Sequence, residues 1–159
     1  MFFCAKPIIK SWIKKIIRIG KKTDAKTDAK KRIESWKKEF QIHSLTEPLS
    51  QKNKIAIEHK IEELCDIIDF CKERSLRPVL GIMPVTKVLR DAIPEEFIQT
   101  VFYDMVQEVQ KKREVPVLDY YRSSEFLDSD LYSDSFLMNE KGRKVFTEKV
   151  LEDLFGIPK

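Results

Sequence analysis

Cysteine and histidine are both scarce in this sequence. Its three cysteines, Cys4, Cys65 and Cys71, form no CxxC pair and have no histidine close by. An odd number of scattered cysteines argues against a disulfide framework, and the missing ligand spacing argues against a zinc site. We therefore predict reduced thiols, no bound metal and no cofactor.

Long apolar runs are also missing. No stretch approaches the roughly 18 apolar residues of a membrane-spanning helix. The first residues, MFFCAK, lack the basic start and long apolar stretch of a secretory signal. We expect a cytoplasmic protein or one that lies peripherally at a membrane. With 159 residues, 42% of them hydrophobic, the chain is long enough to bury a core as one domain.

Charge is distributed unevenly along the chain. Residues 1–54 contain 15 Lys and Arg against 5 Asp and Glu, whereas residues 55–159 contain 15 against 21. The basic part begins with a predicted amphipathic helix, which either packs on the rest of the protein or binds an anionic membrane surface or, less favourably, a nucleic acid. Its apolar residues recur at helical spacing: Ile9, Trp12, Ile13, Ile16 and Ile17.

The segment after this helix has no large apolar side chain. KTDAKTDAK, residues 22–30, repeats a unit of four residues with nothing to bury, which indicates a mobile connector or an exposed helical extension. Residues 32–42 resume a helical pattern, and Pro48 with its polar neighbours ends it. We predict a basic helical extension and linker over residues 1–50 and an α/β subdomain over residues 51–159.

The second part of the chain alternates between helical and strand patterns. Apolar residues spaced by four and three predict helices over residues 54–75 and 95–112. Continuous apolar runs over 77–85 and 114–121 predict two parallel strands, and Asn139 is the predicted N-cap of a last helix. The predicted fold class is α/β, a partial doubly wound (flavodoxin-like) sheet with few parallel strands. The last helix is predicted to face inward with Phe146, Val150, Leu151 and Leu154.

Ligands of open α/β sheets bind beyond the carboxyl ends of the strands. Three segments qualify here: MPVTK after the first strand, LDYYRSSEF after the second, and the turn at Asp134. Asp119 ends the second strand, where an aspartate serves either as a catalytic acid or as the cap of a turn. Tyr120 and Tyr121 are candidates for lining a cleft, whereas the serines of that segment lack a nearby histidine. Three phenylalanines are predicted to be packing groups: Phe102, Phe126 and Phe136.

YSDSFLMNEKGRKVFTEKVL resembles the last conserved block of the SGNH/GDSL hydrolase superfamily. That block consists of Asp, two residues, His, an apolar residue, Asn, two residues, Gly and a helix. Asp134, Asn139, Gly142 and Phe146 are in register with it. PVLGIMPVTKVL and VPVLDYYRSSEF similarly resemble the two preceding strands of envelope-associated members, which take part in D-alanylation of teichoic acid or acyl modification of exported polysaccharides. The resemblance covers about residues 54–155, the C-terminal half of such a domain.

The resemblance implies acyl-ester chemistry. In the family, a serine from an N-terminal Gly-Asp-Ser block attacks an ester carbonyl, and the final Asp and His orient and activate that serine. By this resemblance Asp134 occupies the position of the catalytic aspartate, and Asn139 is a candidate binding residue. The serine hydroxyl is a poor nucleophile until an imidazole takes its proton.

Two parts of that machinery are missing from this sequence. Leu137 stands where the family has histidine, both histidines, His43 and His59, lie outside the motif, and no glycine precedes Asp-Ser. Because losing a triad member removes orders of magnitude in rate, we predict a relative of esterases and acyltransferases of cell-envelope glycans that is inactive alone. Either a missing N-terminal half or a homo-oligomer completes the sheet, or the chain is a non-catalytic binding module with a basic helix.

Overall fold

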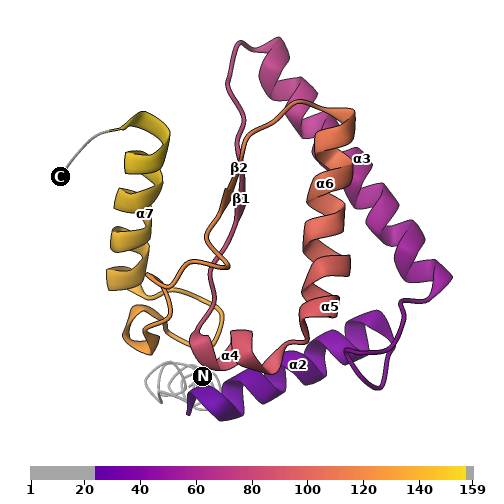
Figure 1. The fold of residues 1–159 in the computed structure, drawn as a ribbon, viewed down its shortest axis with the longest axis vertical. Coiled ribbons are helices and arrows are strands. Elements are labelled where there is room, and N and C mark those ends of the chain that lie inside the picture. Colours follow the sequence, from indigo (N-terminus) through magenta and orange to yellow (C-terminus); the bar gives the residue numbers. More distant parts are fainter. Residues whose placement is uncertain (1–23, 157–159) are drawn as a thin grey trace, which may run out of the picture.

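Two short parallel strands lie between helices, and helices make up most of the structure (Figure 1). The structure, a computed structural model, describes residues 24–156. Helices α3 and α6 pack on one side of the strands, and α7 lies on the other side (Figure 1). In chain order the elements are α2 (Ala25–Phe40), α3 (Gln51–Glu73), β1 (Leu80–Ile82), α4 (Lys87–Ala92), α5 (Glu95–Ile98), the π-helical segment η1 (Gln99–Tyr103), α6 (Asp104–Lys112), β2 (Val117–Asp119), the 3₁₀ turn η2 (Ser129–Leu131) and α7 (Glu140–Phe155).

The sheet consists of β1 paired in parallel with β2, which confirms the predicted parallel pair, and Leu80 lies opposite Val117. Each strand has only three residues, fewer than the apolar runs suggested. Pro78 and Pro84 flank β1, and proline has no amide hydrogen to donate to a ladder. Over the described residues the protein is therefore mostly helical α/β, with a small two-stranded sheet.

Both predicted long helices are present. The Ser50 hydroxyl accepts a hydrogen bond from the Asn53 amide at 3.2 Å and caps α3, which buries Ile61 and Ile68 at the predicted spacing and Cys65 beside them. The second predicted helix is formed by α5, η1 and α6 in succession, so a π-helical stretch interrupts its regular pattern. The short helix α4 was not predicted. Within residues 24–156, no helix has the length and apolar composition to cross a membrane.

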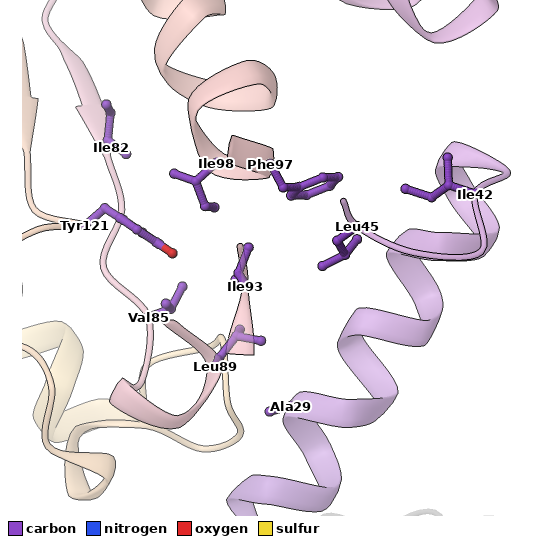
Figure 2. Close-up of a cluster of buried hydrophobic side chains, with 10 residues drawn as sticks. All are labelled: Ala29, Ile42, Leu45, Ile82, Val85, Leu89, Ile93, Phe97, Ile98 and Tyr121. Carbon is purple, nitrogen blue, oxygen red and sulfur yellow. The ribbon is translucent and has the colours of Figure 1, made fainter. Parts of the chain in front are cut away.

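Helix α2 contributes to the same core as the segment after β1. Ala29 on α2 is only 2% exposed and faces Leu89 on α4 (Figure 2). The prediction that the KTDAKTDAK repeat has nothing to bury is therefore wrong, because the small alanine lets α2 approach α4 closely. Ile42 and Leu45 join the same cluster, so residues on both sides of the predicted boundary at residue 50 contribute to it. The predicted basic helix at residues 9–17 lies outside the described residues.

Helix α7 begins after Asn139, as predicted, but buries a narrower face than its sequence suggests. Phe146 and Val150 pack against the cluster of Tyr120, Phe126, Leu131 and Tyr132. The inward orientation predicted for two further residues of α7 is wrong, because they are 44% and 40% exposed: Leu151 and Leu154. At about 100° per residue, Leu151 points away from the face that Phe146 and Val150 share, whereas Leu154 follows Val150 on that face but does not belong to the cluster.

Candidate functional site

The three loops that the sequence singled out meet beyond the carboxyl ends of β1 and β2. The Thr86 amide, in the loop after β1, donates to the Ser135 carbonyl at 3.2 Å, and the Lys87 amide donates to the Leu127 carbonyl at 3.4 Å. The turn at Asp134 thus lies at the sheet edge where ligands of α/β folds bind. A depression of about 240 Å³ opens there, lined by Asp24, Ala25, Thr86, Ser129, Tyr132, Ser133 and Asp134.

The Asp134 carboxylate holds its own turn together. One of its oxygens, Oδ1, accepts the amide hydrogens of Phe136 at 2.8 Å and Leu137 at 2.7 Å. The Leu137 carbonyl in turn accepts the Ser133 amide at 2.8 Å. The carboxylate therefore has a structural role in shaping the turn, while the side chain remains on the wall of the depression.

The apolar residues after Asp134 point to three different surroundings. Phe136 contacts α2, with its ring 6.4 Å from Trp36 in an edge arrangement and 4.9 Å from the Arg32 guanidinium. Met138 packs against the cluster beneath α7. Leu137 has 55% of its surface exposed. Phe136 is itself 37% exposed, so the interpretation of this residue as a packing group holds for one side of its ring.

Neither histidine lies at this turn. His43 is exposed in the loop between α2 and α3, where its amide bonds to the Glu47 carboxylate. His59 is on α3, with its Nδ1 3.7 Å from a carboxylate oxygen of Glu62. Among the described residues, no imidazole is therefore paired with Asp134, and the turn has no general base of the kind that a Ser-His-Asp triad needs.

A polar contact between distant segments lies beside this turn. Ser135 is fully buried, and its hydroxyl and amide both donate to one carboxylate oxygen of Asp28 on α2, at 2.5 and 2.8 Å. The Thr86 hydroxyl donates to the Ser135 carbonyl at 2.9 Å. Burial opposes ionisation of Asp28, but the bonds from Ser135 and the neighbouring Arg32 and Lys31 outweigh it and lower the pKa of Asp28 below its ordinary value.

The Asn-x-x-Gly part of the motif also has a structural explanation. The Asn139 carboxamide oxygen accepts the Gly142 amide at 2.9 Å and caps α7, while its nitrogen donates to the carbonyls of Asp130 and Tyr132 at 2.7 and 3.3 Å. A Cβ at Gly142 would lie 1.9 Å from the Leu131 carbonyl oxygen. Only glycine lets the first turn of α7 approach that carbonyl so closely.

Asp119, at the end of β2, has two partners within the fold. Its Oδ1 accepts the Tyr121 amide at 3.0 Å, and its Oδ2 accepts the Tyr103 hydroxyl at 2.8 Å. Burial, together with this bond to Asp119, raises the pKa of Tyr103 above its ordinary value. The contacts are those of a turn cap that also connects β2 to η1.

The two tyrosines after β2 are buried. Tyr120 is 5% exposed, and its hydroxyl donates to Asp153 on α7 at 3.0 Å. Burial, and then this carboxylate, raise the pKa of Tyr120 to about 12. Tyr121 is 8% exposed within the core cluster of Figure 2, and burial raises its pKa to about 12. Their rings therefore contribute to packing, and neither is among the residues that line the depression.

The sequence did not reveal Asp28, Ser135 and Thr86 as a connected group. Asp28 and Ser135 are 107 positions apart, and nothing in KTDAKTDAK distinguishes one aspartate from the other. Within residues 24–156, no three His, Cys, Asp or Glu side chains are gathered as metal ligands. Of the three connected residues only Thr86 lines the depression, and the hydroxyl of the buried Ser135 is bonded to Asp28.

We compared the chain with protein-family models, with curated proteins and with solved structures, and none of the three comparisons gave a match.

Proposed function

We propose that this chain is an SGNH-like scaffold, related to esterases and acyltransferases of cell-envelope glycans, that does not catalyse acyl transfer by itself. The observation that supports this best is the turn at Asp134. At the sheet edge, the Asp134 carboxylate accepts the amide hydrogens of Phe136 and Leu137. The Leu137 side chain, three positions after Asp134, is a solvent-exposed hydrocarbon in place of the imidazole that the resemblance implies. Hydrocarbon cannot accept the proton of a serine nucleophile.

An incomplete sheet is the second part of this proposal. The Leu80 amide bonds to the Pro116 carbonyl and the Tyr120 amide bonds to the Ile82 carbonyl, so Leu80 and Ile82 face β2. In a parallel pair the residue between them, Gly81, then directs its amide and carbonyl to the outer edge of β1. Gly81 is exposed, and a Cβ added to it would have no described atom within 4 Å. We infer that further strands of a doubly wound sheet pair here, from a separate N-terminal half or a second copy.

Helix α2 favours a non-catalytic role for the same turn. Asp28 bonds Ser135 and Trp36 packs on Phe136, so α2 lies against residues next to the acid-base position. A substrate acyl group that approached the turn from this direction would have to displace α2. A turn that α2 covers on one side suits a scaffold better than an open esterase.

The first test is enzymatic and chemical. The purified chain is expected to leave a chromogenic acetyl ester unhydrolysed above the buffer rate, and a fluorophosphonate probe is expected to label no serine. A serine that reacts with the probe, with labelling and turnover both lost when it is replaced by alanine, would overturn the proposed lack of catalysis.

The second test concerns the resemblance itself. In Leu137→His, the introduced imidazole should titrate at a higher pH than in the double variant Leu137→His, Asp134→Asn, because a nearby carboxylate favours imidazolium. Asparagine keeps an oxygen that can accept the two amides, so the turn is preserved while its charge is removed. NMR titration of the imidazole measures both values. Equal pKa values in the two proteins would show that Asp134 is not the partner that the resemblance implies.

A further inference from the structure

An apolar groove of about 440 Å³ runs along α3 beside η1 and α6, well away from the turn at Asp134. Most of its lining is apolar and comes from three separate parts of the chain. Asn53 fixes one end, because its carboxamide donates to the Phe40 carbonyl at 2.6 Å and joins α3 to the end of α2. The largest apolar side chains of the lining are Phe40, Ile57, Leu64, Ile67, Phe102 and Met105.

Two large side chains of this groove are left in solvent. Ile67 is 58% exposed and Phe102 is 36% exposed. Phe102, which was predicted to be a packing group, is therefore only partly buried, and it belongs to the π-helical segment η1, which departs from the regular helical pattern. A continuous apolar groove with exposed large residues is a surface that a further segment or partner covers.

We propose that residues 7–19 of a second copy of this chain occupy this groove, so that two copies exchange their basic helices. An amphipathic helix that fills a groove presents anchors at positions i, i+3, i+4 and i+7. The segment has apolar residues in that series, at Ile9, Trp12, Ile13 and Ile16, with Ile17 following. Reciprocal exchange gives a closed pair with two identical interfaces.

The length of the connection favours a second copy over the same chain. Helix α2 has 16 residues, so it carries the chain about 24 Å from its start to Phe40, which lines the groove. Between Ile19 and Asp24 there are only four residues, which span at most about 17 Å when fully extended. A helix ending at Ile19 therefore cannot lie along the groove of its own chain without unwinding.

Charge at the rim agrees with a basic occupant. Residues 7–19 carry Lys10, Lys14, Lys15 and Arg18 and no acid. The rim has Glu39 and Glu63 against one cation, Lys60, which pairs with Glu63 at 2.6 Å. Glu39 is exposed and makes no ion pair within residues 24–156, so it can accept a lysine from the incoming helix.

The test is the mass of the full chain in solution, by sedimentation equilibrium over a range of concentrations. The native chain should form a dimer. The control variant Ile55→Glu should also form a dimer, because Ile55 is exposed on α3 outside the groove. Two variants should remain monomeric at concentrations where the native chain is fully dimeric: Ile67→Glu, which changes the groove, and Trp12→Glu, which changes the segment. Circular dichroism then establishes that Ile67→Glu, a change at an exposed position, keeps the native fold.

Mixing separates exchange from other forms of association. The Trp12→Glu chain keeps an intact groove and the Ile67→Glu chain keeps an intact segment, so a mixed dimer has one of the two interfaces intact, whereas neither variant alone has any. The mixture should therefore form dimers, weaker than the native dimer, that neither variant forms alone. Three results would overturn the proposal. They are a mixture that stays monomeric, an Ile67→Glu variant that still forms dimers, and a native chain that is monomeric at every concentration. So would a native chain that stays monomeric and sediments with anionic vesicles when the Trp12→Glu chain does not, since the segment would then bind membrane. The proposal is independent of the proposed function, because esterase activity and the imidazole titration do not depend on it.

Discussion

The turn from Asp134 to Gly142 and the groove along α3 use their side chains in opposite ways. In the turn, Asp134, Ser135 and Asn139 each bond to backbone or side-chain groups within 3.3 Å. In the groove, Ile67 and Phe102 leave much of their apolar surface in water. Polar groups with satisfied partners build a rigid turn with little left to offer a ligand, whereas uncovered apolar surface favours association. Substitutions in the turn should therefore change stability, whereas substitutions in the groove should change association.

The largest effect should come from Gly142→Ala, which tests how closely the turn is packed. Glycine to alanine normally stabilises a helix by about 1 kcal/mol. Here we expect a loss of about 3 kcal/mol in the free energy of unfolding, because the new Cβ would collide with the Leu131 carbonyl. Urea denaturation measures it, with Gly81→Ala as control, since that Cβ would meet no described atom within 4 Å. A stabilised Gly142→Ala protein would contradict the close approach.

A smaller loss is expected for Asn139→Ala, which removes the cap of α7 and two further bonds to the preceding turn. N-cap replacement typically costs about 1–2 kcal/mol. Asn139→Asp keeps the oxygen that accepts the Gly142 amide but loses the donor to the Asp130 and Tyr132 carbonyls, so its stability should lie between those of the native chain and Asn139→Ala. Equal stability of all three proteins in urea would mean that Asn139 is not needed to build the turn.

The hydrogen bonds from Ser135 to Asp28, which join the turn to α2, should make stability depend on pH. The pKa of Asp28 lies below its ordinary value of 3.8, so the ionised carboxylate stabilises the fold above that pH. This contribution is lost as pH falls through the folded pKa. Between pH 5 and pH 2.5, we expect the native chain to lose more stability than Asp28→Asn. The difference between the two losses should be less than about 1 kcal/mol, because solvent screens the interaction of Asp28 with its charged neighbours.

The thermal midpoints of the native chain and Asp28→Asn, measured from pH 5 to pH 2.5, isolate the contribution of Asp28. Asp69 and Asp153 also have a lowered pKa, but they are present in both proteins. A parallel loss of stability in the two proteins would remove Asp28 from the explanation. Like Asp28→Asn, Ser135→Ala should lose less stability than the native chain between pH 5 and pH 2.5, since it deletes the hydroxyl that donates to Asp28.

The smallest effect should come from Leu137→Ser, in the turn that follows Asp134. Because this side chain is 55% exposed, the change should alter the free energy of unfolding by no more than about 0.5 kcal/mol. Met138→Ala, which removes a packed neighbour, should cost about 1–2 kcal/mol and serves as the contrast. A large loss for Leu137→Ser would mean that the leucine has acquired a packing role of its own.

Local patterns in the sequence were enough for much of the secondary structure. The alternation of three and four in α3 survives because a helix that buries one face must repeat near 3.6 residues. The parallel pairing of β1 with β2 was predictable from two apolar runs separated by a helix, and Asn139 was recognisable as a cap from the helical pattern that begins after it. Such features depend on neighbours within a few positions, so they can be predicted from a single chain.

Other features depended on contacts between residues far apart in the chain. The burial of Ala29, the bonds from Ser135 to Asp28 and the exposure of Leu151 were decided by which helix lies against which loop. Asp119 illustrates the same limit, because the sequence left it as either a catalytic acid or a turn cap, and its bonds to Tyr103 and Tyr121 are those of a cap. Spacing along one chain identifies which side chains share a face of an element, but the partner of that face is set only when the elements pack together.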